Sequence, residues 1–334
     1  MADGRNPRRR LPRNFRDRVD LLNNLNDNEV KVKYRLSRQQ IIDLHDLIED
    51  DIKPRTMRSH AIQAMTKLLI TLQFLAKGEF YSEGGLVHGV SRSTVCVSVW
   101  QVVDAINQRV NNIKFPTTQA DLASIKQKFY QVARMPNCIG AVDGTLIPII
   151  APRVREDIYV CRKGYHAINV QAVVTPDMRF TDVVAQWPGS THDNTIFENC
   201  GLKAWVEANN VGWLIGDAGY ALKPYMLTPK IRPTTQQENA FNLAHSRTRM
   251  VVERAFGLLK SRFRCLHKTG GFLQITPEKA AKVFVVCAKL HNMCIDDAVV
   301  FDGQINVAPD NAPPYIGALD PNAQRDRRAI IARF

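Results

Sequence analysis

Four acidic residues have the sequence context of a metal site. Asp143 lies in IGAVDGTLIPI, Asp193 in PGSTHDN and Asp217 in WLIGDAGY, and each ends or interrupts a short apolar segment typical of a buried strand. Glu253 lies in RMVVERAFGLLKSRFR, a helical pattern rich in Arg and Lys. A buried carboxylate is costly unless it is paired or binds a metal. The four residues therefore predict an acidic cluster beside cationic side chains.

Such a cluster suits cleavage of a phosphodiester by two metal ions. Mg²⁺ and Mn²⁺ prefer carboxylate oxygens to His or Cys ligands. Two such ions, about 3.5–4 Å apart, can activate an attacking water and stabilise the leaving oxygen. We expect Asp143 to be shared by both ions, with Asp217 completing one site and Glu253 the other. The alternative for Glu253 is a surface ion pair with Arg249, four residues earlier on the same helix.

Asp193 has two roles open to it. It follows the PGS turn and precedes a helix expected to begin near Asn194. Its side chain either caps that helix or contributes a metal ligand, and spacing alone favours neither role. The preceding His192 is expected to be a structural or substrate-orienting neighbour, because His is a poor ligand for Mg²⁺.

The charge of the chain favours a polyanionic partner. Its 334 residues carry a formal net charge of +13, which raises the local concentration of nucleic acid or anionic membrane. No apolar run approaches the roughly 18–20 residues of a membrane span. We therefore expect DNA as the partner and no association with a membrane. Residues 5–18, RNPRRRLPRNFRDR, are typical of a nuclear localisation signal, a phosphate-contacting tail or a disordered segment.

The seven Cys residues are scattered without a CxxC pair, which argues against a disulfide framework and fits a reducing compartment. Cys287, His291 and Cys294 share one face of an expected helix. Closed structural zinc sites usually take four ligands, and no fourth accompanies these three. We therefore expect them to pack in the core.

The first half of the chain predicts a basic arm and a helical domain. Residues 1–30 are expected to be a disordered arm, and residues 31–130 a helical domain with helices over 36–52, 59–75 and 91–109. A short helix and a turn at Gly89 precede the last of these, which is the outline of a helix-turn-helix unit. Arg92, Ser93 and Thr94 would then face phosphates or bases. The same outline also occurs in domains that never bind DNA.

Residues 136–300 predict an α/β domain. Three β-branched segments at 138–150, 166–176 and 179–189 are followed by a helix at 194–210 and a buried strand at 212–220. One or two helices follow over 238–266, then a last helix over 277–294. This order matches the ribonuclease-H-like fold, a mixed sheet flanked by helices, in which acids on the first and fourth strands are neighbours. Residues 301–334 are expected to form a loosely ordered tail.

Four ordered segments carry a family resemblance. GAVDGTLIPI, GSTHDNTIF, GDAGYALKPYMLTP and RMVVERAFGLLKSRFRCL, followed by LHNMC, resemble the PIF/Harbinger transposase superfamily of DDE-type endonucleases, and within it the nucleases derived from harbinger transposases. The resemblance covers about residues 30–300. It implies Asp143, Asp217 and Glu253 as the catalytic triad, Asp193 as a further metal position, and Mg²⁺ or Mn²⁺ as cofactor.

The chain departs from this family pattern at three positions near the acidic residues. Leu146 stands where His is common, and Asn194 and Ala218 stand where Ser is common. None of these changes removes a carboxylate. The resemblance also implies an oligomer if the protein is a transposase, and a separate Myb- or SANT-like DNA-binding partner that aids nuclear entry. Together with the Arg-rich segment at 5–18, this favours a location in the nucleus, either alone or shared with the cytoplasm.

The leading interpretation is a Mg²⁺-dependent DNA endonuclease that hydrolyses phosphodiester bonds, with or without strand transfer to a target. Arg249, Arg254 and Lys260 on the Glu253 helix would contact the DNA backbone. A second interpretation is a domesticated, catalytically silent DNA- or protein-binding module. A third interpretation is a two-metal phosphatase or ribonuclease. The long basic segments fit this interpretation less well than they fit a DNA endonuclease.

Overall fold

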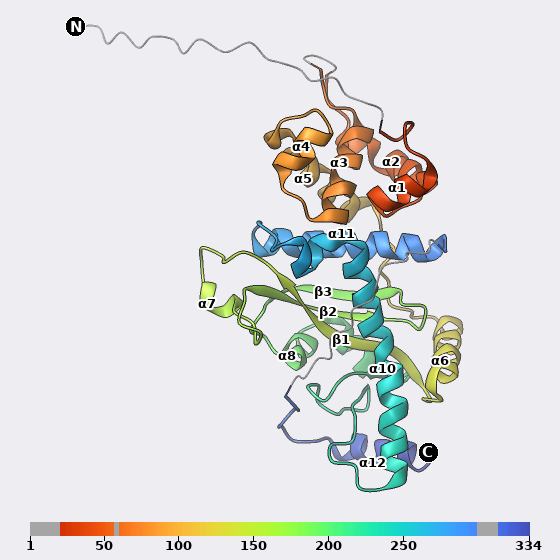
Figure 1. Ribbon diagram of the computed structural model, residues 1–334. Helices are drawn as coiled ribbons and strands as arrows, with labels where there is room; N and C mark the ends of the chain where they lie inside the picture. The colour runs from red at the N-terminus through yellow and green to blue at the C-terminus, as the bar shows by residue number, and fades with distance from the viewer. Residues whose placement is uncertain (1–20, 57–59, 299–312) are drawn as a thin grey trace, which may run out of the picture.

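The computed structural model describes residues 21–56, 60–298 and 313–334 (Figure 1). The Arg-rich segment at 5–18 lies outside the described residues. The helices are α1 (Asp27–Tyr34), α2 (Arg38–Ile52), α3 (Ala64–Lys77), α4 (Tyr81–Val87), α5 (Arg92–Arg109), α6 (Gln119–Ala133), α7 (Glu156–Tyr159), α8 (Asp193–Glu198), α9 (Gly201–Asn209), α10 (Gln236–Arg262), α11 (Pro277–Asp296) and α12 (Pro321–Ile331). The strands are β1 (Cys138–Pro148), β2 (Ala167–Val174), β3 (Phe180–Pro188), β4 (Trp213–Ile215) and β5 (Met226–Leu227), and two short 3₁₀ helices are η1 (Arg264–Leu266) and η2 (Lys268–Gly270).

The five strands form one mixed sheet in the order β3-β2-β1-β4-β5. β1 pairs antiparallel with β2 and parallel with β4. Ala141 on β1 is opposite Ile215 on β4. Asp143 lies two residues after Ala141, and Asp217 lies two residues after Ile215. The two aspartates therefore occur at the same level of the sheet. The predicted mixed sheet flanked by helices is confirmed.

Helices cover both faces of the sheet. Every residue of β2 is buried, as expected for a strand packed on both sides. One core cluster joins alternate β1 and β2 residues to α10 and α11, and a second joins the other face to α8 and α9. The ring of Phe180 at the start of β3 packs against Phe256 of α10 and Phe284 of α11, with centroids 5.9 and 6.5 Å away.

Helices α1–α5 form a cap on the far side of α11 from the sheet (Figure 1). Ser37 caps α2 and Ser91 caps α5 through side-chain hydrogen bonds, which confirms those two predicted helix starts. The cap and the sheet share one hydrophobic core through α11. Helix α6, placed mostly in the helical domain by its position in sequence, packs instead on β1 and α10.

Two expectations about the elements need correction. Helix α1 begins at Asp27, inside the segment expected to be a disordered arm, because Asn26 and Glu29 form a capping box. The single helix expected over 194–210 is two, α8 and α9, separated at Asn199–Cys200. The one or two helices expected over 238–266 are one continuous helix of 27 residues, α10, followed by the short η1. None of the helices in the described part of the chain is both long and apolar enough to cross a membrane.

The expected loose tail contains an ordered helix. Asp320 caps α12, and a proline occupies its first turn. Ile330 and Ile331 are buried in the main core, and Arg327 donates to the carbonyl oxygen of Pro229 at 3.0 Å. Only two large apolar side chains anchor this helix, so its periodicity was too weak to read from the sequence.

The Cys287, His291 and Cys294 side chains are all buried in the core, which confirms the packing expected for them. The imidazole of His291 lies 2.9 Å from the carbonyl oxygen of Met178 and 3.2 Å from a guanidinium nitrogen of Arg262. Both ring nitrogens are therefore engaged by the protein.

Candidate active site

Asp143 and Asp217 form the centre of the site. Their side chains are almost fully buried, with 2% and 7% of the residue exposed. Asp143 accepts a hydrogen bond from the backbone N–H of Gly144 at 2.8 Å, and Asp217 accepts one from Gly219 at 2.9 Å. Each carboxylate is thus held by the backbone that follows it, and each retains oxygens that can bind a cation.

Asp193 approaches β1 at Gly144. Side chains alternate along a strand, so Asp143 faces α10 while Gly144 faces α8. A Cβ atom at Gly144 would lie 2.2 Å from Oδ1 of Asp193, closer than any real contact. The missing side chain at Gly144 is therefore what admits the Asp193 carboxylate next to β1.

Asn169 on β2 fixes the position of Asp193. Its side-chain N–H groups donate to Oδ1 of Asp193 at 2.7 Å and to the carbonyl oxygen of Thr191 at 2.9 Å. The N-cap of α8 is His192, and no side chain caps this helix. The capping role that was open to Asp193 is therefore absent, and its carboxylate is oriented from the sheet instead.

Helix α10 brings a cation and a fourth carboxylate. Arg249 donates to Oδ2 of Asp143 at 3.0 Å and also forms an ion pair with Glu253. The Arg249 and Glu253 side chains are 16% and 12% exposed. The i, i+4 pair considered for Glu253 does form, but it is enclosed in the site rather than on the surface. One guanidinium therefore links the Asp143 and Glu253 carboxylates.

The environment disfavours negative charge on all three aspartates. Burial raises the pKa of Asp143 to about 8, repulsion from Asp217 and Asp193 adds to this, and Arg249 opposes it. Burial also raises the pKa of Asp193, against the Asn169 hydrogen bond, and the pKa of Asp217, against the Gly219 hydrogen bond. The aspartates are close enough to repel one another, so the site favours an added cation.

The donor set is chemically suited to a hard divalent cation. The four acidic side chains offer only oxygen, which Mg²⁺ and Mn²⁺ prefer. Among the described residues, no three His, Cys, Asp or Glu side chains converge closely enough to hold one ion as they stand. Arg249 occupies the space between Asp143 and Glu253. Binding of a metal by that pair thus requires this guanidinium to move.

Asp143 makes the stability of the metal-free protein depend on pH. Its folded-state pKa of about 8 exceeds the ordinary 3.8, so stability from this group is fully present below about pH 4 and lost as pH rises to 8. Asp143→Asn is neutral at every pH. In the presence of EDTA we expect it to exceed the wild type in unfolding free energy at pH 8 by several kcal/mol, about 1.4 kcal/mol for each unit by which the pKa is raised, and to match it near pH 4.

Urea unfolding at several pH values measures this difference. Asp46→Asn, at an exposed position of α2, is the matched control and is expected to lack the trend. An Asp143→Asn protein that is less stable than the wild type at pH 8 would contradict the burial of a charge at this position.

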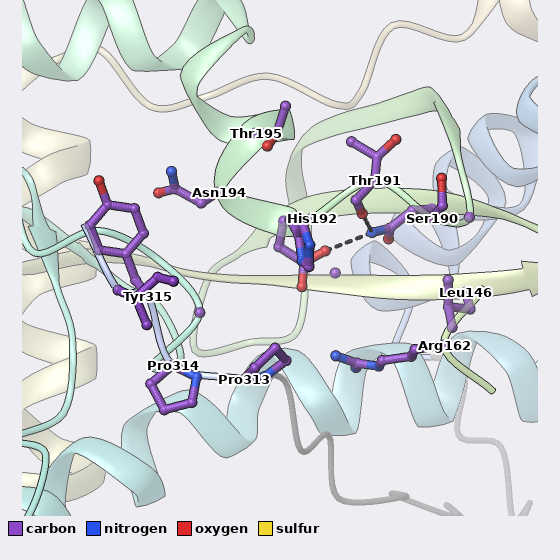
Figure 2. Close-up of a pocket in the computed structure, with 16 residues that line it drawn as sticks. Leu146, Arg162, Ser190, Thr191, His192, Asn194, Thr195, Pro313, Pro314 and Tyr315 are labelled. Atoms are coloured by element: carbon purple, nitrogen blue, oxygen red, sulfur yellow. Dashed lines mark hydrogen bonds between the residues drawn. The ribbon is translucent and has the colours of Figure 1, made fainter. Parts of the chain in front are cut away.

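Two cavities open on either side of the β1 segment Gly144–Leu146, and Arg162 lines both. The first, of about 450 Å³, contains Asp193 and is bordered by the C-terminal residues 313–316. Tyr315 donates its backbone N–H to the carbonyl oxygen of Ala218 at 2.7 Å. In Figure 2, Tyr315 lies at the Asn194 end of this cavity and Arg162 at the Leu146 end.

The second cavity, of about 370 Å³, contains Asp143 and Glu253. Lys260, expected to contact DNA, lines this cavity and donates to Oγ1 of Thr145 at 2.8 Å and to the carbonyl oxygen of Leu146 at 3.0 Å. Arg254 is exposed on α10. Of the six residues expected to bind DNA, only Arg249 and Lys260 lie at the carboxylates.

The other expected DNA contacts are remote from the carboxylates. Arg92 and Ser93 are exposed at the start of α5, in the cap. The Thr94 hydroxyl lies 2.9 Å from that of Ser91, within the helix cap. The structure does not bring this group together with the acidic site.

Asn169 and Arg162 were missed in the sequence. Asn169 is a polar residue inside the apolar strand AINVQAVV, and that interruption was the available signal. Burial raises the pKa of Asp193 and of Asp217, and the charge of Arg162, in a turn after α7, partly opposes this rise. A basic residue in a loop carries no such signal, and Tyr315 lay in a segment expected to be loose.

Comparison with known proteins shows the family to which this chain belongs. Residues 142–292 match the family model described as DDE superfamily endonuclease. The human protein named "Putative nuclease HARBI1" is 32% identical over 318 residues, which cover 93% of this chain and 91% of the human one. "Protein ALP1-like" of Arabidopsis thaliana is 30% identical over 79% of this chain and 70% of its own length.

A bacterial relative extends the comparison. The "Probable transposase for insertion sequence element IS702" of Microchaete diplosiphon is 24% identical over 253 residues, 71% of this chain and 87% of the relative. No solved structure matches the chain with significance.

Proposed function

Because the chain belongs to the DDE superfamily of endonucleases, together with the HARBI1 nucleases, we propose that it is a divalent-metal-dependent nuclease that hydrolyses DNA phosphodiester bonds. The observation that supports this most is the grouping of Asp143 and Asp217 at one level of the sheet, with Glu253 linked to Asp143 through Arg249. Mg²⁺ or Mn²⁺ would be held by these three carboxylates and by Asp193. When bound, the cation supplies charge for water activation and for the leaving oxygen.

Residues of the chain hold the acidic side chains in position and compensate their charge. Asn169 holds the Asp193 carboxylate, and the backbone N–H groups of Gly144 and Gly219 hold those of Asp143 and Asp217. Apolar neighbours such as Val142 limit the access of water, which strengthens electrostatic interactions in the site. Arg249 holds the acidic groups together in the absence of metal.

Arg249 is proposed to exchange its carboxylate partners for a DNA phosphate when a cation occupies the site. Arg is suited to this because its guanidinium binds carboxylates and phosphates in the same two-pronged geometry. Lys260 and the exposed Arg254 would contact the backbone from the same helix. Arg92, Ser93 and Thr94 stay a proposal for DNA contact by the cap.

A direct test is nicking of supercoiled plasmid with Mg²⁺, compared with EDTA. The silent-module alternative is separated by metal binding itself. We expect Mn²⁺ to raise the unfolding free energy of the wild type by about 2.7 kcal/mol at a hundred times its dissociation constant, measured as a thermal shift. Asp143→Asn should lose most of that shift. A wild type without any metal-induced shift would favour a silent binding module.

Arg249→Gln tests whether this residue substitutes for the metal. Its removal leaves the enclosed Asp143 and Glu253 carboxylates without a counter-charge, so we expect the metal-free protein to lose about 3 kcal/mol of stability at pH 8. Mn²⁺ should then stabilise the variant more than it stabilises the wild type, because the ion no longer competes with the guanidinium. Arg254→Gln, five residues on and exposed, is the control. Equal Mn²⁺ effects in Arg249→Gln and wild type would refute the competition.

We further propose three features at the level of the whole protein. Strand transfer to target DNA would follow cleavage if the protein is a transposase, and an oligomer would then hold two DNA ends. A separate Myb- or SANT-like protein would supply site recognition. A nuclear location, either alone or shared with the cytoplasm, is proposed because the Arg-rich segment at 5–18 is typical of a nuclear localisation signal.

A further inference from the structure

A group of cations lies beside the catalytic carboxylates without a carboxylate partner. The second cavity is acidic at Asp143 and Glu253, while Lys163, Lys260 and Lys268 line it as well. Lys163 follows α7 in a turn and Lys268 begins η2. Segments distant in sequence therefore supply the three lysines.

Lys260 is the inner member of this group. Its ammonium donates only to neutral oxygens, those of Thr145 and Leu146. Burial lowers the pKa of Lys260 to about 7, and repulsion from Lys163 contributes. Lys163 and Lys260 line the same cavity. His267, which also lines the cavity, has its pKa lowered by burial and by Lys260 and Lys268.

No acid in the described part of the chain neutralises these lysines. None of the three forms an ion pair there, and the acids in the same cavity, Asp143 and Glu253, are already bound to Arg249. Like charges gathered in a partly enclosed space repel one another, and an anion placed between them removes that cost. The arrangement is that of a binding site for an anionic group.

The nature of the anion follows from the rest of the lining. Tyr165 also lines the cavity, and its ring packs 5.7 Å from that of the exposed Phe272. Aromatic faces beside a cationic groove are typical of sites that bind a nucleic-acid strand. The acidic end of the cavity, at Asp143 and Glu253, belongs to the proposed cleavage site. When the scissile phosphate of a DNA strand lies there, the neighbouring phosphate of the strand lies further along the cavity.

We propose that Lys163, Lys260 and Lys268 form a subsite for a DNA backbone phosphate next to the scissile phosphate. This inference rests on the proposed nuclease function and extends it, because Lys163 and Lys268 lie outside the acidic cluster and outside α10. The subsite would fix the register of the strand, so that one particular phosphate meets the carboxylates.

The test is binding of a fluorescently labelled single-stranded oligonucleotide, measured by anisotropy in Ca²⁺ over a range of salt concentrations. Lys163→Gln/Lys268→Gln removes two exposed charges and leaves the half-buried Lys260 in place. Removal of one lysine–phosphate interaction lowers the log–log salt slope by about 0.7 for single strands. We expect the slope to fall by about 1.4 and the affinity to drop about tenfold.

The control variant Lys31→Gln/Lys114→Gln carries the same change in net charge at two exposed positions outside the cavity. It is expected to leave the slope unchanged. A scan of oligonucleotides with single neutral methylphosphonates should then show one position whose effect in the wild type disappears in Lys163→Gln/Lys268→Gln.

Three results would overturn the subsite. Equal salt slopes for the two double variants would mean that only the overall charge of the protein affects DNA binding, which refutes the subsite. If the wild type still nicks plasmid in that case, the nuclease proposal stands without the subsite. Stabilisation of the wild type by inorganic phosphate without any change in DNA binding by Lys163→Gln/Lys268→Gln would indicate a site for free phosphate. Absence of DNA binding by the wild type would refute the subsite and the nuclease proposal together.

Discussion

Asp143→Asn is expected to lower Mg²⁺-dependent DNA cleavage by about 10³-fold or more while leaving the protein folded. Asp143 is the most enclosed of the acidic groups, and Asp217 and Asp193 are its charged neighbours. Asn keeps the size of the side chain and its hydrogen bond to Gly144 but removes the charge that holds a cation. A loss of about 4 kcal/mol of transition-state stabilisation corresponds to a factor of about 10³.

The same loss is expected for Asp217→Asn and Glu253→Gln, measured as initial nicking rates with equal amounts of folded protein. Asp182→Asn is the matched control. Asp182 is another carboxylate whose pKa burial raises, to about 6, but it lies on β3, which β2 separates from β1. Removing it is expected to leave the nicking rate within a factor of a few. Undiminished nicking by all three site variants would end the nuclease proposal.

Gly144→Ala is expected to reduce cleavage by about 100-fold although it touches no charge. The added methyl group would lie 2.2 Å from Oδ1 and 2.6 Å from Cγ of Asp193, so Asp193 must leave its position beside β1. Asn169 would then lose its hydrogen-bond partner. Displacement of a reacting group by about 1 Å can cost a factor of 100. The nicking rate and the Mn²⁺-induced thermal shift measure the effect.

Gly201→Ala is the control for this substitution. A Cβ atom there has nothing within 4 Å, and Ala favours the helix that begins at this residue. We expect wild-type nicking from Gly201→Ala. If Gly144→Ala also nicks at the wild-type rate, the position of Asp193 beside β1 has no role in the reaction, and its place in the metal set must be withdrawn.

Much of the frame of this site follows from local pattern. The apolar run before Asp217 and the β-branched run around Asp143 each predicted a buried strand, and the order of elements predicted their adjacency. Glu253 was placed on a helix by the apolar period of 3.6 residues around it. These predictions depend on neighbours in sequence, and the mixed sheet confirms the strand adjacency.

The rest depends on contacts between distant segments. Arg249 was expected on the DNA-facing surface, but its guanidinium links two carboxylates because α10 packs against β1 at this level. The approach of Asp193 to Gly144 joins β1 to the start of α8 across β2. The border formed by residues 313–316 brings a segment just before α12 next to Asp193, far from it in the sequence. No local pattern in the sequence predicts contacts between segments that lie so far apart along the chain.

Helix α10 also gives the molecule a mechanical property. With 27 residues and no proline, it is a rod about 40 Å long, and one part of it carries Arg249, Glu253 and Lys260. Its first half packs on α12, and its C-terminal end leads into η1, which contacts α3 of the cap. A force applied to the cap would therefore push or twist this helix as a unit, and the side chains of Arg249 and Glu253 would move with it.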